Sequence, residues 1–356
     1  MSMKKKYIDI LLIAVAVLLN ACSSGDSGVQ PDSPDKPVKK EIQVMTYASQ
    51  FAETALSRRA APPTGFSEYT PDKTTNMGIY MLLSENPATD WATPEEKKII
   101  YTNKWHAYFE VTPDKTYTVY GYMPKTGDMS SSLTKSTADA ATLTIYNIKS
   151  VTTDDICIIT GVKNTDEELK EGQFSWYWPV GDDNYKIYIL MDHLYAAVLF
   201  RLKIDAEYAS LRTIKLKTMT LRTDCGSVIA TITLTHNTTG ASPISGVGFA
   251  PSPSGSSEDF LVFNSDAGTA LDKDTPVDIN TCFAPTLSNN LTMVTTYDVY
   301  DRNNNLIREN STATNKLPDL AAVRGQKVQV NLTVNPTYLY VLSEPDLDNP
   351  TITVEN

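Results

Sequence analysis

The sequence contains few of the residues and motifs on which most enzyme and metal chemistry depends. Its 356 residues include 3 histidines and 4 cysteines, and nucleophile-elbow, zinc-protease, P-loop and dinucleotide-binding motifs do not occur. His106, His193 and His236 share no metal-ligand spacing with one another or with the cysteines. We expect His193 to cap a turn rather than to bind a ligand. The pattern predicts a protein that is not an enzyme and holds neither a cofactor nor a metal ion.

Basic charge is also scarce. The chain has 31 Lys and Arg residues against 42 Asp and Glu residues, which gives a net charge of −11 and a pI near 4.8. Nucleic-acid binding requires a basic face to neutralise phosphates. The composition therefore predicts no nucleic-acid partner.

The cysteines do not form the pattern of a disulfide framework. Apart from Cys22, three remain at long intervals, which are Cys157, Cys225 and Cys282. Cys157 lies in the apolar run ICIIT and is predicted to be a small core residue. A bridge between Cys225 and Cys282 is left open by the sequence.

Only one long apolar run occurs, and it lies close to the N-terminus. Three lysines precede Ile10–Leu19, a run of signal-peptide length that is too short to span a membrane. It ends in Leu-Asn-Ala-Cys at residues 19–22, which resembles a bacterial lipobox. We expect residues 1–21 to be a lipoprotein signal peptide and Cys22 to carry the lipid anchor; an ordinary signal peptide is the alternative. Residues 22–41 are polar and are predicted to be a flexible tether.

Strand signals dominate the rest of the chain. Runs of β-branched and aromatic residues alternate with turn residues about every ten positions, which is typical of all-β sandwiches. Short helical turns are predicted at 93–98 and 192–197, and long surface connections at 124–141 and 237–258. A polar cluster at 181–184 predicts two domains, 42–184 and 185–356. The predicted strands are 78–83, 105–111, 116–123, 156–160, 186–191, 196–204, 211–221, 227–234, 259–263, 292–299, 326–334 and 351–354.

The first strand has a distinctive setting. Ile42, Val44, Thr46 and Ala48 fall on one face of an alternating segment, which predicts that these four side chains point inward. The dibasic pair Arg58-Arg59 follows, and then Ala-Ala-Pro-Pro, in a stretch with neither helix nor strand character. Such a stretch is an exposed site for a protease.

Two further segments, together with the lipobox and the first strand, resemble the fimbrillins, the FimA-type pilins that are exported as lipoproteins. Residues 190–204, LMDHLYAAVLFRLKI, are similar to the segment that opens the second domain in that family. Residues 324–334, RGQKVQVNLTV, are similar to a late strand of the family. The resemblance covers nearly the whole chain.

The resemblance implies two tandem transthyretin-like Greek-key sandwiches and a structural subunit, of the stalk, in a cell-surface fimbria. It implies that an Arg-specific surface protease cuts at Arg59 or Arg58, leaves Ala60 as the new N-terminus and frees the first strand. The C-terminal segment Thr351-Ile352-Thr353-Val354 would then enter the groove of another copy or of a related pilin. The expected location is the outer membrane first, through the lipid anchor, and then the extracellular fimbrium, where host or bacterial surfaces are candidate receptors.

Other functions stay open at this stage. One alternative to a stalk subunit is a tip or anchor subunit of the same pilus, which would have a similar sequence. An alternative to the donor role of the final strand is that it packs only on its own domain. A monomeric surface lipoprotein that binds glycans or host proteins is the second candidate, because Trp176-Tyr177-Trp178 offers rings for sugar stacking. Packing in the core is the favoured interpretation of these rings.

Overall fold

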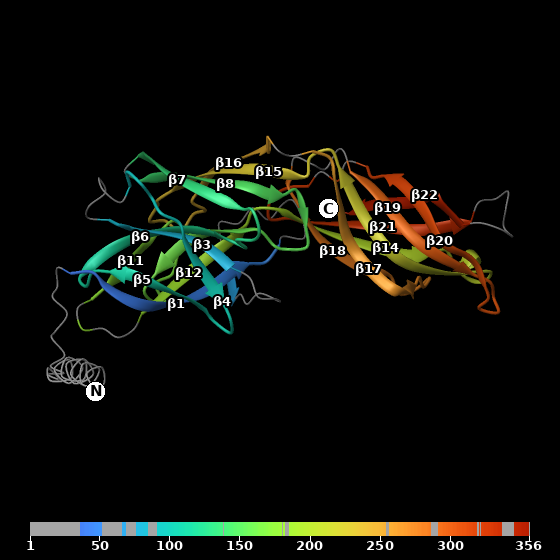
Figure 1. Ribbon diagram of the computed structural model, residues 1–356, viewed down its shortest axis with the longest axis horizontal. Helices are drawn as coiled ribbons and strands as arrows, with labels where there is room; N and C mark the ends of the chain where they lie inside the picture. The colour runs from blue at the N-terminus through green and yellow to red at the C-terminus, as the bar shows by residue number, and fades with distance from the viewer. Residues whose placement is uncertain are drawn as a thin grey trace, which may run out of the picture.

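The chain folds into an elongated all-β structure with two halves (Figure 1). This computed structural model describes residues 36–51, 66–68, 76–84, 91–137, 139–179, 181, 185–253, 256–285, 291–318, 320, 322–336 and 345–355. In those ranges one helix, α3 (Ala206–Ala209), occurs, and no helix has the length and apolarity needed to cross a membrane. Each strand predicted from the sequence overlaps an observed strand.

The first half is built on a nine-stranded sheet. It runs in the order β10-β12-β1-β5-β4-β3-β6-β11, with β2 paired to β1, and it closes on itself because β6 also pairs with β10. Its strands are β1 (Val38–Ser49), β2 (Phe66–Glu68), β3 (Asn76–Leu83), β4 (Lys97–Tyr101), β5 (Trp105–Val111), β6 (Lys115–Met123), β10 (Cys157–Lys163), β11 (Ser175–Trp178) and β12 (Lys186–His193).

A four-stranded sheet packs on the first one and shares its hydrophobic cluster. Its order is β16-β15-β8-β7, and its buried face includes Leu143, Ile145 and Ile232. The strands are β7 (Ser130–Thr137), β8 (Ala140–Lys149), β15 (Ser227–Thr235) and β16 (Ile244–Pro251).

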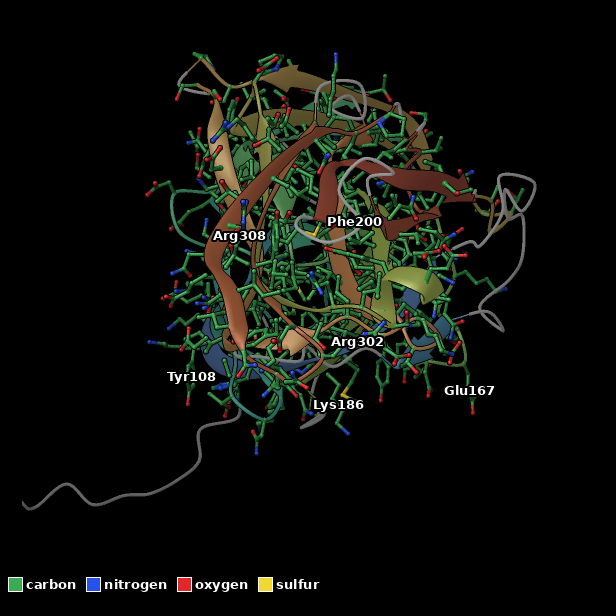
Figure 2. The ribbon with its side chains drawn as sticks, turned by 90° about the vertical axis from the view of Figure 1, so that its right-hand side faces the viewer. Tyr108, Glu167, Lys186, Phe200, Arg302 and Arg308 are labelled. Carbon is green, nitrogen blue, oxygen red and sulfur yellow. The ribbon has the colours of Figure 1, made fainter. Side chains whose placement is uncertain are left out.

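The second half has two sheets around a second hydrophobic cluster. The five-stranded sheet, in the order β22-β21-β13-β18-β9, contains β9 (Val151–Thr152), β13 (Ala196–Ile204), β18 (Val277–Phe283), β21 (Lys327–Pro336) and β22 (Pro345–Glu355). The four-stranded sheet, in the order β17-β14-β19-β20, contains β14 (Thr213–Thr223), β17 (Glu258–Ala270), β19 (Thr292–Tyr300) and β20 (Leu306–Lys316). Figure 2 shows Phe200 of β13 inside this half and Tyr108 of β5 on an outer face.

The chain passes between the halves more than once. Strand β12 is hydrogen-bonded within the first sheet, and β15 and β16 also belong to the first half. The predicted domain boundary after residue 184 therefore disagrees with the strand pairing, because it assigns β12, β15 and β16 to the second domain. The crossing that follows β12 lies at Leu194 and Tyr195, where β12 ends and β13 begins.

Several sequence predictions are wrong in detail. The expected connections at 124–141 and 237–258 contain β7 and β16, the outer strands of their sheet. Most of their side chains face solvent, so their apolar alternation is too weak to be recognised. Residues 97–98, within an expected helical turn, begin β4, and residues 192–197 belong mainly to β12 and β13.

Strand β1 begins earlier than predicted. Val38 pairs with Val111 of β5, so the last residues of the expected tether are already part of the sheet. Lys39 and Lys40 are accommodated because their ammonium groups lie 5.7 and 5.1 Å from the ring centroids of Tyr108 and Tyr185.

Candidate functional site

Strand β1 is an interior strand of the first sheet. Residues 43–48 run parallel to residues 186–191 of β12, and residues 38–44 run antiparallel to residues 105–111 of β5. Both sides of β1 are therefore engaged in backbone hydrogen bonding. Removal of β1 would leave β5 and β12 with unpaired edges.

The inward face of β1 is the one that the alternation predicted. Ile42, Val44, Thr46 and Ala48 are 0 to 3% exposed, and the residues between them are half-buried. Burial of Ile42 and of Val44 stabilises the fold by about 1.5–3 kcal/mol for each side chain. Without β1, a groove lined by the first hydrophobic cluster would be open to solvent.

A set of polar contacts holds the C-terminal end of β1. The backbone carbonyl of Ser49 accepts a hydrogen bond from His193 Nε2 at 2.7 Å, and Ser49 Oγ donates to Asp192 at 3.0 Å. The ring of Phe51 stacks on His193, with centroids 3.6 Å apart and an angle of 16° between the planes. Sequence analysis missed Ser49 and Phe51, because their partners lie more than 140 residues away.

His193 and Asp192 are themselves anchored. His193 Nδ1 lies 2.9 Å from Asp155 Oδ2, while Arg324 donates to Asp192 Oδ2 and to the His193 carbonyl at 2.8 and 2.9 Å. Burial alone lowers the pKa of His193, but the hydrogen bond and charge of Asp155, with Asp192 and the Ser49 carbonyl, outweigh it and raise the pKa. The expected turn cap is thus wrong, because His193 ends strand β12 and its side chain is buried.

The C-terminal strand lies on its own half of the molecule. Residues 351–354, the predicted donor segment, belong to β22, which runs antiparallel to β21 at the end of the five-stranded sheet. Asn331 faces Thr353 and Val330 faces Val354 in this ladder, and Val354 packs partly buried against the second cluster. In this structure the final strand packs on its own half, as in the alternative interpretation of its sequence.

Other predicted residues lie outside the described residues. These are Cys22, Arg58, Arg59 and Ala60. Lipidation at Cys22 and cleavage at the dibasic pair stay predictions.

The aromatic cluster belongs mainly to the core, as favoured from the sequence. Trp176 and Trp178 are 0 and 2% exposed, and Trp176 Nε1 donates to the Lys186 carbonyl at 3.0 Å. Tyr177 is exposed on the opposite face of β11. The two tryptophan rings are not available to stack on a sugar, which removes the main reason for proposing a glycan-binding monomer.

The cysteines of the described residues are free. Cys157 is a buried core residue, as predicted, and burial raises the pKa of its thiol well above the ordinary value. Cys225 and Cys282 are also free and buried, so the bridge that the sequence left open is not formed.

Comparison with known proteins gives matches to solved structures only. No family model and no curated protein matches the sequence. A proposed cell adhesion protein from Bacteroides fragilis is 10% identical, with a TM-score of 0.40, over 89% of this chain and 97% of that chain. A fimbrial protein from Bacteroides vulgatus is 11% identical, with a TM-score of 0.34, over 88 and 99% of the two chains.

A third match is to a proposed polysaccharide-binding protein from Bacteroides thetaiotaomicron. It is 9% identical, with a TM-score of 0.34, over 83% of this chain and 92% of that chain. At these identities and TM-scores the likenesses carry no argument about family or function. The case for a function therefore rests on the residues of this chain.

Proposed function

We propose that this protein is a structural subunit, of the stalk, in a cell-surface fimbria that assembles by strand exchange. In this proposal the chain is exported as a lipoprotein through Cys22 and is cut by an Arg-specific protease at Arg58 or Arg59. Strand β1 then leaves, and the C-terminal strand of the next subunit takes its place. The subunit would thereby contribute to adhesion or biofilm formation. Two transthyretin-like Greek-key sandwiches are the fold that accompanies the proposal.

The single observation that carries the proposal is the position of β1. Strand β1 is a buried interior strand of its sheet, although it is the first described strand of the chain. The segment with the dibasic pair follows it directly. A cut there would convert β1 from an intramolecular partner into a separate peptide. A strand from another chain could then add to the free edges of β5 and β12.

The sequence of the C-terminal strand suits the groove. Ile352 and Val354 have the same spacing of two as Ile42 and Val44, so an incoming strand could present apolar side chains at matching positions. A head-to-tail contact of this kind does not close on itself and therefore generates a filament.

The experiment is limited proteolysis of the uncleaved chain with an Arg-specific protease, followed by mass spectrometry and sedimentation. We expect a cut after Arg58 or Arg59, loss of the β1 peptide and growth of oligomers. The matched control replaces both residues by lysine, which keeps the charge and removes the recognition site. The absence of a discrete cut in 52–65, or a cut chain that stays monomeric, would count against the proposed function.

A further inference from the structure

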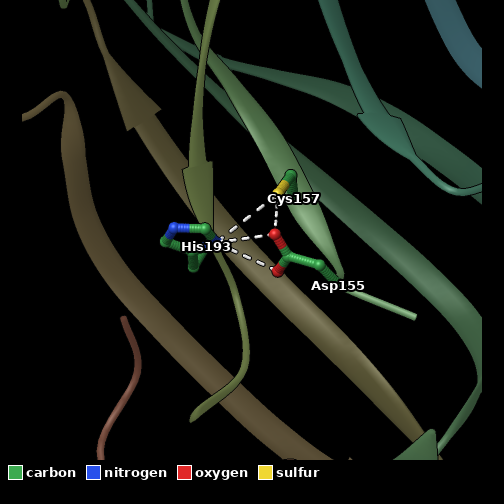
Figure 3. A group of neighbouring side chains, drawn as sticks. All are labelled: Asp155, Cys157 and His193. Carbon is green, nitrogen blue, oxygen red and sulfur yellow. Dashed lines mark hydrogen bonds and ion pairs between the residues drawn. The ribbon is translucent and has the colours of Figure 1, made fainter. Parts of the chain in front are cut away.

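Three side chains with metal-binding chemistry meet at the junction of β10 and β12. Cys157 is the first residue of β10 and faces His193, the last residue of β12, across the antiparallel ladder. Asp155 precedes β10 by two residues and points its carboxylate at both (Figure 3). His193 follows Cys157 by 36 positions and Asp155 by 38, which is why the sequence spacing did not indicate a site.

The separations between the ligand atoms lie within a few tenths of an ångström of those in one face of a coordination tetrahedron. Asp155 Oδ2 lies 2.9 Å from His193 Nδ1 and 3.2 Å from Cys157 Sγ, and Sγ lies 3.7 Å from Nδ1. Zinc bonds of about 2.0–2.2 Å to nitrogen or oxygen and about 2.3 Å to sulfur place tetrahedral ligand atoms about 3.2–3.6 Å apart. An ion therefore fits with shifts of a few tenths of an ångström.

The remainder of the site orients the imidazole for binding through Nδ1. Nε2 donates to the Ser49 carbonyl at 2.7 Å, and the stacked ring of Phe51 fixes the plane of His193. A backbone carbonyl that accepts from the distal nitrogen is the usual support for a metal-bound histidine. His193 and Cys157 are 4 and 0% exposed, so both side chains are held in place by packing.

The chemical types of the three ligands indicate which metal ion would bind. A thiolate and an imidazole favour zinc over magnesium or calcium, which prefer oxygen ligands alone. Asp192, which precedes His193 in the chain, is paired with Arg324, so its carboxylate does not compete for the ion. A thiolate from Cys157 and the carboxylate of Asp155 balance the charge of one divalent ion.

We propose that Asp155, Cys157 and His193 bind one Zn²⁺ ion, with water as the fourth ligand. Binding releases two protons to solvent, the thiol proton of Cys157 and the proton shared between His193 Nδ1 and Asp155, so that a thiolate, a carboxylate and a neutral imidazole are the ligands. The inference does not depend on cleavage of the chain or on strand exchange, because the site is complete in the uncleaved protein.

The test uses the full-length secreted chain with Cys22→Ser, which prevents lipidation and removes the additional thiol. After incubation with ZnCl₂ and desalting, elemental analysis should find about one zinc per chain. Replacement of zinc by Co²⁺ should give a sulfur-to-cobalt charge-transfer band in the near ultraviolet. Circular dichroism establishes that each variant remains folded.

Two variants and one control locate the ion. Cys157→Ser should abolish the charge-transfer band, and Asp155→Asn should weaken zinc binding by about tenfold or more. Cys225→Ser changes another buried free cysteine, whose thiol donates to the Ser227 carbonyl at 3.0 Å, and should leave both readouts unchanged. Little zinc in the parent chain, a cobalt complex without the sulfur band, or unchanged binding in folded Cys157→Ser would overturn the proposal.

Discussion

At the scale of single residues, Glu171 is a carboxyl group that the fold holds in an unusual state. Burial and the negative charge of Asp192 raise its pKa from 4.5 to about 7, and the positive charge of Arg324 opposes this only in part. The folded protein binds this proton more tightly than the unfolded chain does. The favourable contribution of protonated Glu171 to the free energy of unfolding is therefore at its maximum below pH 4.5. It is lost as the pH rises to about 7.

We therefore expect Glu171→Gln to stabilise the protein at pH 8 by about 3 kcal/mol relative to its effect at pH 4.5. The amide keeps the shape of the side chain and cannot ionise. Urea unfolding of both proteins across this pH range measures the difference. A variant whose free energy of unfolding stays parallel to that of the parent at every pH would show that Glu171 is not held protonated.

Ile42 tests whether β1 is as firmly packed as its burial indicates. The side chain is 0% exposed within the first cluster, so Ile42→Ala removes buried methyl groups and leaves a cavity. The free energy of unfolding should fall by about 2–5 kcal/mol. Lys39→Ala, on an exposed position of the same strand, should change it by about 0.5 kcal/mol or less. Equal effects of the two substitutions would mean that β1 is not anchored through its inner face.

At the scale of elements, the two terminal strands differ in how they are held. Strand β1 has partners on both sides and a buried face, whereas β22 pairs with β21 alone in the described sheet. A strand at the edge of a sheet dissociates at lower cost than an interior one. This difference explains why, in the proposed assembly, β1 requires a cut in the chain whereas β22 can be released from its own half.

Deletion of Asp346–Asn356 should leave a folded protein that does not elongate after cleavage. The second cluster loses the partly buried Val354, so that half of the molecule becomes modestly less stable. Thermal unfolding by circular dichroism checks the fold, and sedimentation after cleavage checks elongation. Polymers of the truncated chain equal to those of the full chain would show that β22 is not the donor.

The sequence was sufficient to predict elements whose pattern is local. The alternation at Ile42, Val44, Thr46 and Ala48 identified the buried face of β1, because period-two apolarity directly reflects one-sided burial. The start of β1 was misplaced, because Lys39 and Lys40 look like tether until the rings of Tyr108 and Tyr185 are brought beside them.

Features that depend on distant pairing could not be predicted in the same way. The contact between Ser49 and His193 joins residues 144 positions apart, and neither residue alone indicates the other. Likewise, β22 pairs with β21 at the end of the five-stranded sheet. The sequence predicted each of these two strands but not that they pair. The position of β15 and β16 in the first half was missed for the same reason.

At the scale of the whole molecule, strand exchange requires β22 to leave β21 before it can complete another subunit. Asn331 and Thr353 are register partners, and opposite residues in antiparallel strands lie about 4.5–5.5 Å apart between Cα atoms, within the range of a disulfide. The double substitution Asn331→Cys and Thr353→Cys would therefore fix the strand on its own subunit under oxidising conditions. The single Thr353→Cys chain is the control for effects of the added thiol.

The most direct measurement is the sedimentation of this doubly substituted chain after cleavage by the Arg-specific protease, with and without reductant. Strand exchange predicts that the oxidised chain stays monomeric and that the same sample forms filaments once the disulfide is reduced. Filaments from the oxidised chain, or a cleaved and reduced chain that remains monomeric, would contradict it.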